Sequence, residues 1–217
     1  MPYSATGFRD WQACLQAGKE RLESGPFSRY NVQYLLRTLR DLSKTEPKGK
    51  EPPMPHFNIV LHEPEIPSNT GNIGRTCVAA GASLHLIEPL GFRLNEKNIR
   101  RAGMDYWEKL DVTRYLDYAD FIRQHGDAPI FYASTKAARL YTEVAYPENC
   151  FIMFGKESGG IPEDILRRHP DTAVRIPMLE DIRSLNLANS VAIVLYEALR
   201  QHDFSHMQKK GMLAGAD

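Results

Sequence analysis

The chain has 217 residues, of which 42% are hydrophobic, and its 27 basic and 27 acidic residues give a net charge of zero. This is the composition of one medium-sized globular domain with an appendage. No apolar run reaches the length of a transmembrane helix, and neutrality confines any nucleic-acid-binding surface to a local basic patch.

The N-terminal 43 residues are predicted to form a helical extension. An amphipathic stripe marks its second half: Val32, Leu35, Leu36, Leu39 and Leu42. Residues 44–55 (KTEPKGKEPPMP) are rich in proline and charge, which is typical of an extended linker. Since a helical pair of this size cannot bury a large core alone, we expect it to pack on the main domain, a second subunit or a partner.

Residues 56–203 are predicted to form the main domain, followed by a polar tail over 204–217. Short apolar runs predict strands, and apolar residues at helical spacing predict helices between them. The expected strands are 57–61, 83–89, 129–134, 150–155 and 173–178, and the expected helices are 71–81, 115–125, one that opens at 161–162 and one over 187–199. This alternation predicts an α/β fold with a parallel sheet that has helices on both faces.

Three loops that leave strands contain more Gly, Asn, Ser and Pro than a simple connection requires, and they lie over 63–75, 154–162 and 175–189. Ligands of open parallel sheets lie beyond the carboxyl ends of strands, so these loops are the candidate site. In the first loop, Asn69 and Thr70 are predicted to cap the following helix, which would place Arg75 in its first or second turn. The same residues also suit a purely structural junction.

The second loop, FGKESGGIP, contains three glycines and one acidic residue, Glu157. Glycines let a backbone wrap closely around a flat ligand, although Glu157 can also be an ordinary solvated carboxylate. The third loop contains Ser184 and Asn186 beside apolar residues, a mixture that suits adenine and ribose. None of the loops matches a dinucleotide fingerprint or a phosphate loop, which argues against NAD and ATP.

No catalytic triad, carboxylate pair or metal cluster is evident in the sequence, so we expect a site without metal. Cys14, Cys77 and Cys150 are widely separated and form no CxxC pair, and the start of the chain lacks the features of a secretory signal. We therefore expect a cytoplasmic protein with reduced thiols. A reaction with an already activated electrophile, such as methyl transfer from a sulfonium, needs mainly alignment and shielding from water.

Four ordered motifs resemble the SpoU-type (SPOUT) RNA 2'-O-methyltransferases: NTGNIGR at 69–75, RRAGMDYW at 100–107, FGKESGGIP at 154–162 and RIPM…RSLNLANSV at 175–191. Within that superfamily, NIVL-x-EPEIP and IEP-x-GF make the chain similar to the tRNA wobble-nucleotide 2'-O-methyltransferases. The resemblance implies a deep C-terminal trefoil knot, a homodimer, S-adenosylmethionine as methyl donor and nucleotide 34, cytidine or uridine, in the tRNA anticodon loop as acceptor. Such knots are otherwise nearly absent from proteins, so no pattern predicts one.

The resemblance also implies roles for individual residues. Arg75 would lie near the 2'-hydroxyl as the catalytic residue, and because a guanidinium stays protonated we expect it to hold a phosphate or polarise the oxygen. The residues expected to bind the donor are Ala133, Ser134, Gly155, Ile176, Ser184, Leu185 and Asn186. The residues expected near RNA are Asn69, Arg100, Arg101, Glu157, Arg183 and Tyr196.

Two alternatives remain open from the sequence. A ribosomal RNA 2'-O-methyltransferase of the same fold would share these motifs, although such enzymes often have a separate RNA-recruiting domain at the N-terminus. A non-catalytic knotted RNA-binding protein would keep the fold and lose turnover. The presence of Arg75, Glu157, Ser184 and Asn186 favours an enzyme.

Overall fold

The computed structural model describes residues 56–93, 107–205 and 207–211. The chain divides into two compact units between residues 52 and 53, and the described residues all belong to the second unit. The helical extension expected over 1–43 and the linker expected over 44–55 lie outside the described residues, so both stay predictions.

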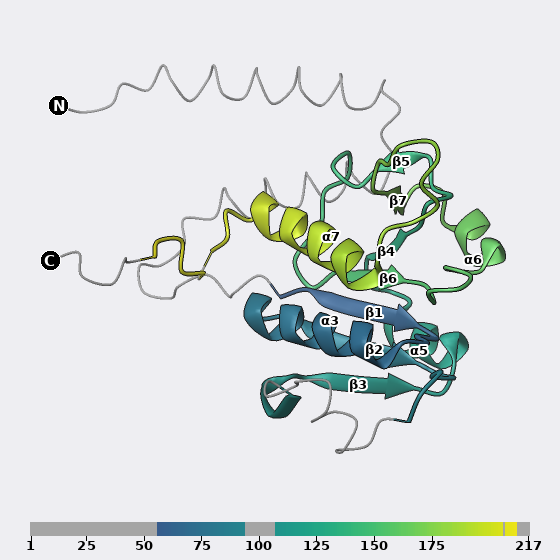
Figure 1. Cartoon of the computed structure of the whole chain (residues 1–217), viewed down its shortest axis with the longest axis horizontal. Helices are drawn as coiled ribbons and strands as arrows, with labels where there is room; N and C mark the ends of the chain where they lie inside the picture. Colours follow the sequence, from purple (N-terminus) through teal and green to yellow (C-terminus); the bar gives the residue numbers. More distant parts are fainter. Residues whose placement is uncertain (1–55, 94–106, 206, 212–217) are drawn as a thin grey trace, which may run out of the picture. The chain divides into compact units, whose positions relative to one another are not determined.

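A seven-stranded sheet forms the centre of the described domain (Figure 1). Its strands are β1 Asn58–His62, β2 Ser83–Ile87, β3 Val112–Tyr115, β4 Ile130–Ala133, β5 Arg139–Leu140, β6 Phe151–Phe154 and β7 Ala173–Arg175. They lie in the order β3-β2-β1-β6-β4-β7-β5, and each neighbouring pair is parallel. The expected parallel α/β sheet is therefore confirmed.

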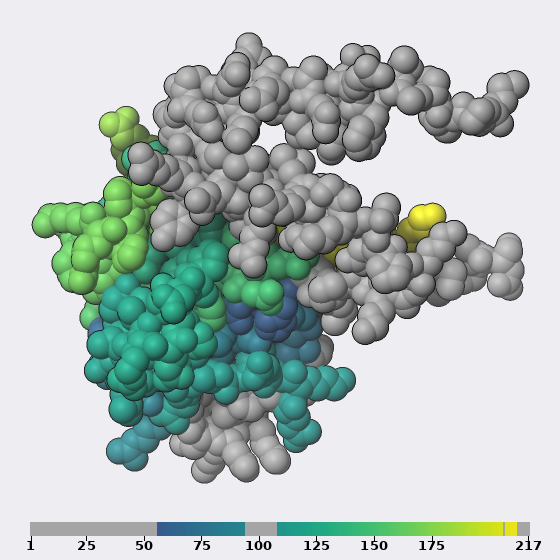
Figure 2. All heavy atoms as spheres, turned by 180° about the vertical axis from the view of Figure 1, so that it is seen from behind, coloured from purple at the N-terminus to yellow at the C-terminus, as the bar shows by residue number. Residues whose placement is uncertain are grey.

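Helices cover both faces of this sheet. They are α3 Pro67–Ala80, α5 Tyr118–His125, α6 Glu163–Arg168 and α7 Leu187–Gln201, with a short 3₁₀ helix, η1, at Trp107–Lys109. Helices α3 and α7 pack side by side on one face (Figure 1). Helices α5 and α6 cover the other face, and Figure 2 shows their outer surface from behind.

Two apolar cores lie on opposite sides of the sheet because successive side chains of a strand point to opposite faces. In β1, Ile59 and Leu61 belong to the core under α3 and α7, whereas Val60 belongs to the core under α5 and α6. Strands β1 and β2 are buried at every position, as expected for parallel strands covered on both faces.

Helix α3 begins earlier than the sequence predicts. Ile66 is its N-cap residue and makes no side-chain capping hydrogen bond, while Pro67 occupies the first helical position. The prediction that Asn69 and Thr70 cap the helix is therefore wrong, since both lie buried inside its first turn. Proline suits this first position because its missing N–H would have no helical partner there. Arg75 consequently lies in the third turn of α3 and not in the first or second.

The two edge strands β3 and β5 were not expected. The helix predicted over 115–125 begins only at Tyr118, and Tyr115 ends β3. The predicted strands over 83–89 and 173–178 end earlier, at Ile87 and Arg175. The remaining elements fall where the hydrophobic pattern places them, and the apolar stripe of α7 is buried as predicted.

Candidate functional site

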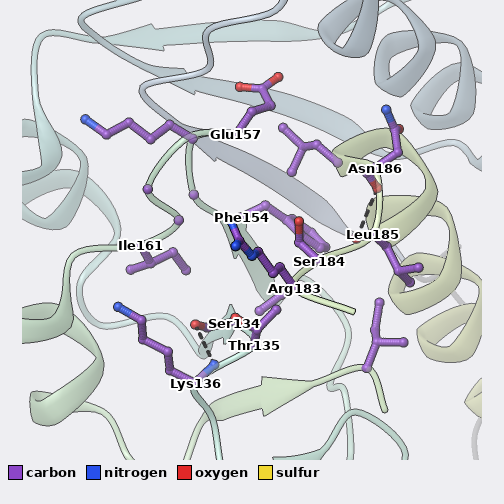
Figure 3. Close-up of a pocket in the computed structure, with 18 of the residues that line it drawn as sticks. Ser134, Thr135, Lys136, Phe154, Glu157, Ile161, Arg183, Ser184, Leu185 and Asn186 are labelled. Atoms are coloured by element: carbon purple, nitrogen blue, oxygen red, sulfur yellow. Dashed lines mark hydrogen bonds between the residues drawn. The ribbon is translucent and has the colours of Figure 1, made fainter. Parts of the chain in front are cut away.

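A pocket of about 590 Å³ lies beyond the carboxyl ends of β4, β6 and β7, next to the start of α7 (Figure 3). Apolar side chains such as Ile161, Val174 and Val194 form part of its wall. Hydroxyl and amide groups of Ser134, Ser184 and Asn186 lie among them, as do backbone groups of the glycine-rich loop 155–160. The pocket thus lies where ligands of parallel α/β proteins bind.

The structure brings together all the residues that the sequence analysis expects to bind the donor. They line this single pocket: Ala133, Ser134, Gly155, Ile176, Ser184, Leu185 and Asn186. Three residues expected near RNA, Asn69, Glu157 and Arg183, line it as well. The donor-binding residues converge because each lies at or just after the end of a strand, or in the segment that leads into α7.

Two expected site residues lie outside the pocket. Arg75 is exposed on α3, and Tyr196 is 41% exposed on α7. Arg100 and Arg101 lie outside the described residues, so their expected RNA contacts stay predictions. Within one copy of the chain, the predicted catalytic arginine therefore does not contribute to the pocket wall.

The glycine-rich loop 155–160 folds back on itself. Gly160 N donates to the Lys156 carbonyl at 2.8 Å, and the two residues form an antiparallel bridge. A Cβ atom on Gly155 would lie 1.9 Å from the Gly160 carbonyl carbon and 2.1 Å from Ile161 N. Gly155 is thus required for the close approach of the loop's own backbone, whereas the sequence had suggested a close approach of ligand.

Glu157 accepts hydrogen bonds from three protein donors. They are Glu65 N at 2.8 Å, Ile66 N at 3.3 Å and Asn69 Nδ2 at 2.9 Å. Asn69 Oδ1 in turn accepts from Asn186 Nδ2 at 3.0 Å. Asn186 Oδ1 caps α7 by accepting from Ala188 N at 2.9 Å and Asn189 N at 3.3 Å. Asn186 is thus the N-cap residue of α7 as well as part of the pocket wall.

Neighbouring charges reinforce the same contact between loops. Ser158 donates from its N and Oγ to the Glu65 carboxylate at 2.9 and 2.7 Å, and these bonds hold the pKa of Glu65 below its usual range. Lys156 Nζ donates to Glu63 Oε2 at 2.9 Å, which raises the pKa of that lysine. The loop after β1 and the loop after β6 are therefore joined by several charge-assisted bonds.

The sequence analysis missed several residues of the pocket wall, including Lys136, Lys156, Ser190 and Val194. A signal existed for two of them, because Ser190 and Val194 lie on the same helical face as Leu187. The side chain of Lys136 forms an ion pair with Glu163, with 2.6 Å between Nζ and Oε1. Its backbone N donates to Ser134 Oγ at 3.2 Å (Figure 3).

A second polar cluster lies away from the pocket, in the core under α5. Tyr115 Oη lies 2.8 Å from both His85 Nδ1 and His125 Nε2. Burial is the main cause that lowers the pKa of His85 to about 4, and the neighbouring His125 contributes to the same shift. Across the described parts of the chain, no group of three or more His, Cys, Asp or Glu side chains could hold a metal ion.

Comparisons with known proteins agree on one family. A sequence model described as the SpoU rRNA Methylase family matches residues 56–196. A tRNA (cytidine(34)-2'-O)-methyltransferase of Escherichia coli K12 is 48% identical over 146 residues, which cover 67% of this chain and 93% of that enzyme.

Solved structures give the same picture. A structure that concerns 2-OH methylation of C/U34 on tRNA is 41% identical, with a TM-score of 0.65, and the match covers 69% of this chain and 97% of that one. An AdoMet-bound rRNA methyltransferase from Sinorhizobium meliloti is 28% identical, with a TM-score of 0.60, and the match covers 67% of this chain and 56% of that one.

Proposed function

Since this chain belongs to the SpoU rRNA Methylase family, we propose that it is an S-adenosylmethionine-dependent methyltransferase that modifies the 2'-oxygen of nucleotide 34, cytidine or uridine, in tRNA. One observation favours this function over the alternative functions. Nearly the whole length of the E. coli tRNA enzyme aligns with the domain whose strand ends form the pocket. The chain is therefore an enzyme, and its family accounts for the resemblance of the four motifs.

The residues of the pocket fit the proposed methyl donor. Its apolar side chains, Ile161, Val174 and Leu185 among them, offer surfaces for a flat base. Ser134, Ser184 and Asn186 offer hydroxyl and amide groups at the polar end. When bound, S-adenosylmethionine supplies an activated methyl group on a positively charged sulfur. The protein's part is to orient the donor and to exclude water.

We propose that Arg75 assists at the acceptor ribose. Its guanidinium stays protonated, so it suits contact with a phosphate or polarisation of the 2'-oxygen and does not suit proton removal. Arg183 lies exposed at the pocket and is proposed to contact the RNA backbone. Arg100, Arg101 and Tyr196 are proposed as further contacts with the anticodon loop, since basic groups bind phosphates and aromatic rings stack on unpaired bases.

We further propose that two copies of the chain form a homodimer. Arg75 and Tyr196 are exposed on α3 and α7, which pack side by side, and neither residue lines the pocket of its own chain. Association through these helices would allow Arg75 of one copy to approach the pocket of the other. The molar mass of the full chain in solution, measured by light scattering, tests this proposal: a monomer would contradict it.

Three other features belong to the proposal. The C-terminal part of the domain, from β6 to α7, is proposed to form a deep trefoil knot, which the similarity in fold to a SpoU methyltransferase structure, with a TM-score of 0.58, supports. Residues 1–43 are proposed to form a helical extension, as their leucine stripe indicates. Because tRNA is the proposed substrate, we place the protein in the cytoplasm. No helix in the described part of the chain has the length and apolarity to cross a membrane.

The experiment that tests the function uses labelled S-adenosylmethionine and total tRNA from cells that lack 2'-O-methylation at nucleotide 34. We expect label on the ribose of nucleotide 34, mapped by digestion and mass spectrometry. If the protein binds the donor but does not label tRNA, ribosomal RNA becomes the favoured acceptor, and it is then tested in the same assay. Absence of donor binding would instead favour a non-catalytic RNA-binding protein.

A further inference from the structure

Glu157 makes three hydrogen bonds at the edge of the pocket, although the resemblance suggested contact with RNA. Its carboxylate oxygens already accept from Glu65 N, Ile66 N and Asn69 Nδ2. These donors come from the loop after β1 and from the first turn of α3, whereas Glu157 follows β6. The carboxylate therefore links two loops that follow neighbouring parallel strands.

The hydrogen bonds continue from Glu157 to the start of α7. Asn69 Nδ2 donates to Glu157, and Asn69 Oδ1 accepts from Asn186 Nδ2 at 3.0 Å. Asn186 Oδ1 then accepts from the free N–H groups of Ala188 and Asn189. We call this chain of side chains, Glu157–Asn69–Asn186, the amide relay. All three residues line the pocket.

The relay can adopt only one polarity. At one end a carboxylate without a proton can only accept, and at the other end the helix N–H groups can only donate. Each amide must therefore turn its nitrogen toward Glu157 and its oxygen toward α7. A glutamine at position 157 would place its own N–H donor against at least one of the three donors that Glu157 accepts from, Glu65 N, Ile66 N and Asn69 Nδ2. That hydrogen bond would be lost, and the amides would no longer be held in a single orientation.

We propose that Glu157 is a positioning residue of the donor pocket, which holds Asn69 and Asn186 in the single arrangement that binds S-adenosylmethionine. It acts through these two amides and does not contact RNA. Asn69, which was expected near RNA, is assigned to the same relay. This inference rests on the proposed function, because it names S-adenosylmethionine as the ligand of the pocket.

The test compares donor binding and tRNA binding in the full chain. Calorimetry measures the dissociation constant of S-adenosylmethionine, filter binding measures that of tRNA, and thermal melting checks that each variant is folded. We expect Glu157→Gln and Asn69→Asp each to weaken donor binding roughly 10- to 100-fold, since a charge-assisted acceptor is lost or a second carboxylate faces the first. Affinity for tRNA stays unchanged.

The decisive variant combines both changes. In Glu157→Gln with Asn69→Asp, the new amide can donate to the new carboxylate, which can also accept from Asn186 Nδ2, so the polarity toward α7 is restored. We expect the double variant to recover most of the donor affinity that either single change loses. The double variant has the same net charge as the wild type, whereas the two single variants differ from it by one charge in opposite directions. A loss of donor affinity in both single variants is therefore not explained by a change of net charge in one direction.

Asp120→Asn is the matched control. Asp120 on α5 also accepts from one backbone N–H, Leu116 N at 3.1 Å, and from two side chains, yet it lies on the opposite face of the sheet. We expect this variant to bind the donor like the wild type. The proposal is overturned if folded Glu157→Gln binds the donor normally, if only tRNA binding falls, or if the double variant is no better than the single ones. If the wild type itself binds no S-adenosylmethionine, the proposed function fails first.

Discussion

Replacement of Gly155 by alanine tests the geometry of the glycine-rich loop directly. The added Cβ would lie 1.9 Å from the Gly160 carbonyl carbon, 2.1 Å from Ile161 N and 2.4 Å from the Gly160 oxygen. Real Cβ atoms essentially never approach closer than 3.0 Å, so the loop must move by at least 3.0 − 1.9 = 1.1 Å. The obstacle is backbone, which cannot rotate away as a side chain can.

This shift would displace the backbone that forms one wall of the pocket. Overpacking of this kind costs about 1–3 kcal/mol of folding free energy. A misplacement of about 1 Å in a catalytic site can lower the rate on the order of 100-fold. We therefore expect Gly155→Ala to lower kcat/KM for tRNA methylation by roughly that factor and to weaken donor binding measured by calorimetry.

Gly159→Ala provides the control in the same loop. Its Cβ would come no closer than 3.3 Å, to Lys156 Cε near the end of a flexible side chain, so we expect a change in unfolding free energy within about 0.5 kcal/mol. Urea unfolding and single-turnover methylation of both variants complete the experiment. If Gly155→Ala kept wild-type donor affinity and turnover, the steric account of this loop would be wrong.

Three further predictions concern the acceptor, the second core and the start of α7. Arg75→Lys should lower single-turnover methylation roughly 100-fold while donor binding is kept, because an ammonium cannot reproduce the guanidinium's hydrogen bonds; full turnover would remove the specific role of the guanidinium. His85 is buried with a lowered pKa, so its neutral form stabilises the fold above pH 6.5, and this contribution should be lost as the pH falls from 6.5 to about 4. At about 1.4 kcal/mol per pKa unit, this contribution to the free energy of unfolding amounts to about 3 kcal/mol. Urea unfolding at pH 6.5 and at pH 4 measures it, and we expect the free energy of unfolding to fall less in His85→Gln than in the wild type. An equal fall in both proteins would exclude His85 as the cause. Asn186→Ala should destabilise the fold by about 1 kcal/mol through the lost cap. Asn186→Asp should keep the cap and the stability but lose donor affinity because it cannot donate to Asn69, and normal binding would contradict that role.

Much of the fold was predictable because its central strands are mainly apolar and are buried on both faces. Strands β1, β2 and β6 are buried at each position, and such segments stand out in a sequence. The edge strand β3 does not stand out in the sequence, because Thr113 and Arg114 are exposed and only Tyr115 is buried. β5 has only two residues, too few for any periodicity.

The start of α3 was misplaced for a different reason. Asn69 and Thr70 resembled caps because both are polar residues in front of an apolar helical pattern. Proline at the first helical position was the competing signal, and it decided the outcome. Asn69 is buried because it serves a contact between loops rather than the helix end.

The pocket was predictable to the extent that it depends on strand ends. The rule that ligands bind beyond the carboxyl ends of parallel strands places 133–134, 155 and 176 together once the strands are identified. The contacts of Glu65 with Ser158 and of Glu157 with Asn69 could not be predicted from local pattern. They depend on β1 lying beside β6, and these strands are far apart in the chain.

The separation of β1 from β6 in the sequence affects how the protein folds while it is synthesised on the ribosome. β1 emerges about 90 residues before β6, its partner on one side, and at 5–20 residues per second this corresponds to an interval of roughly 5 to 20 seconds. During this time one edge of β1 has no strand beside it, although its segment Asn58–His62 is buried at each position in the finished fold. Such an apolar edge is a template for pairing with other chains. Protection of the nascent N-terminal half is therefore a requirement set by the strand order itself.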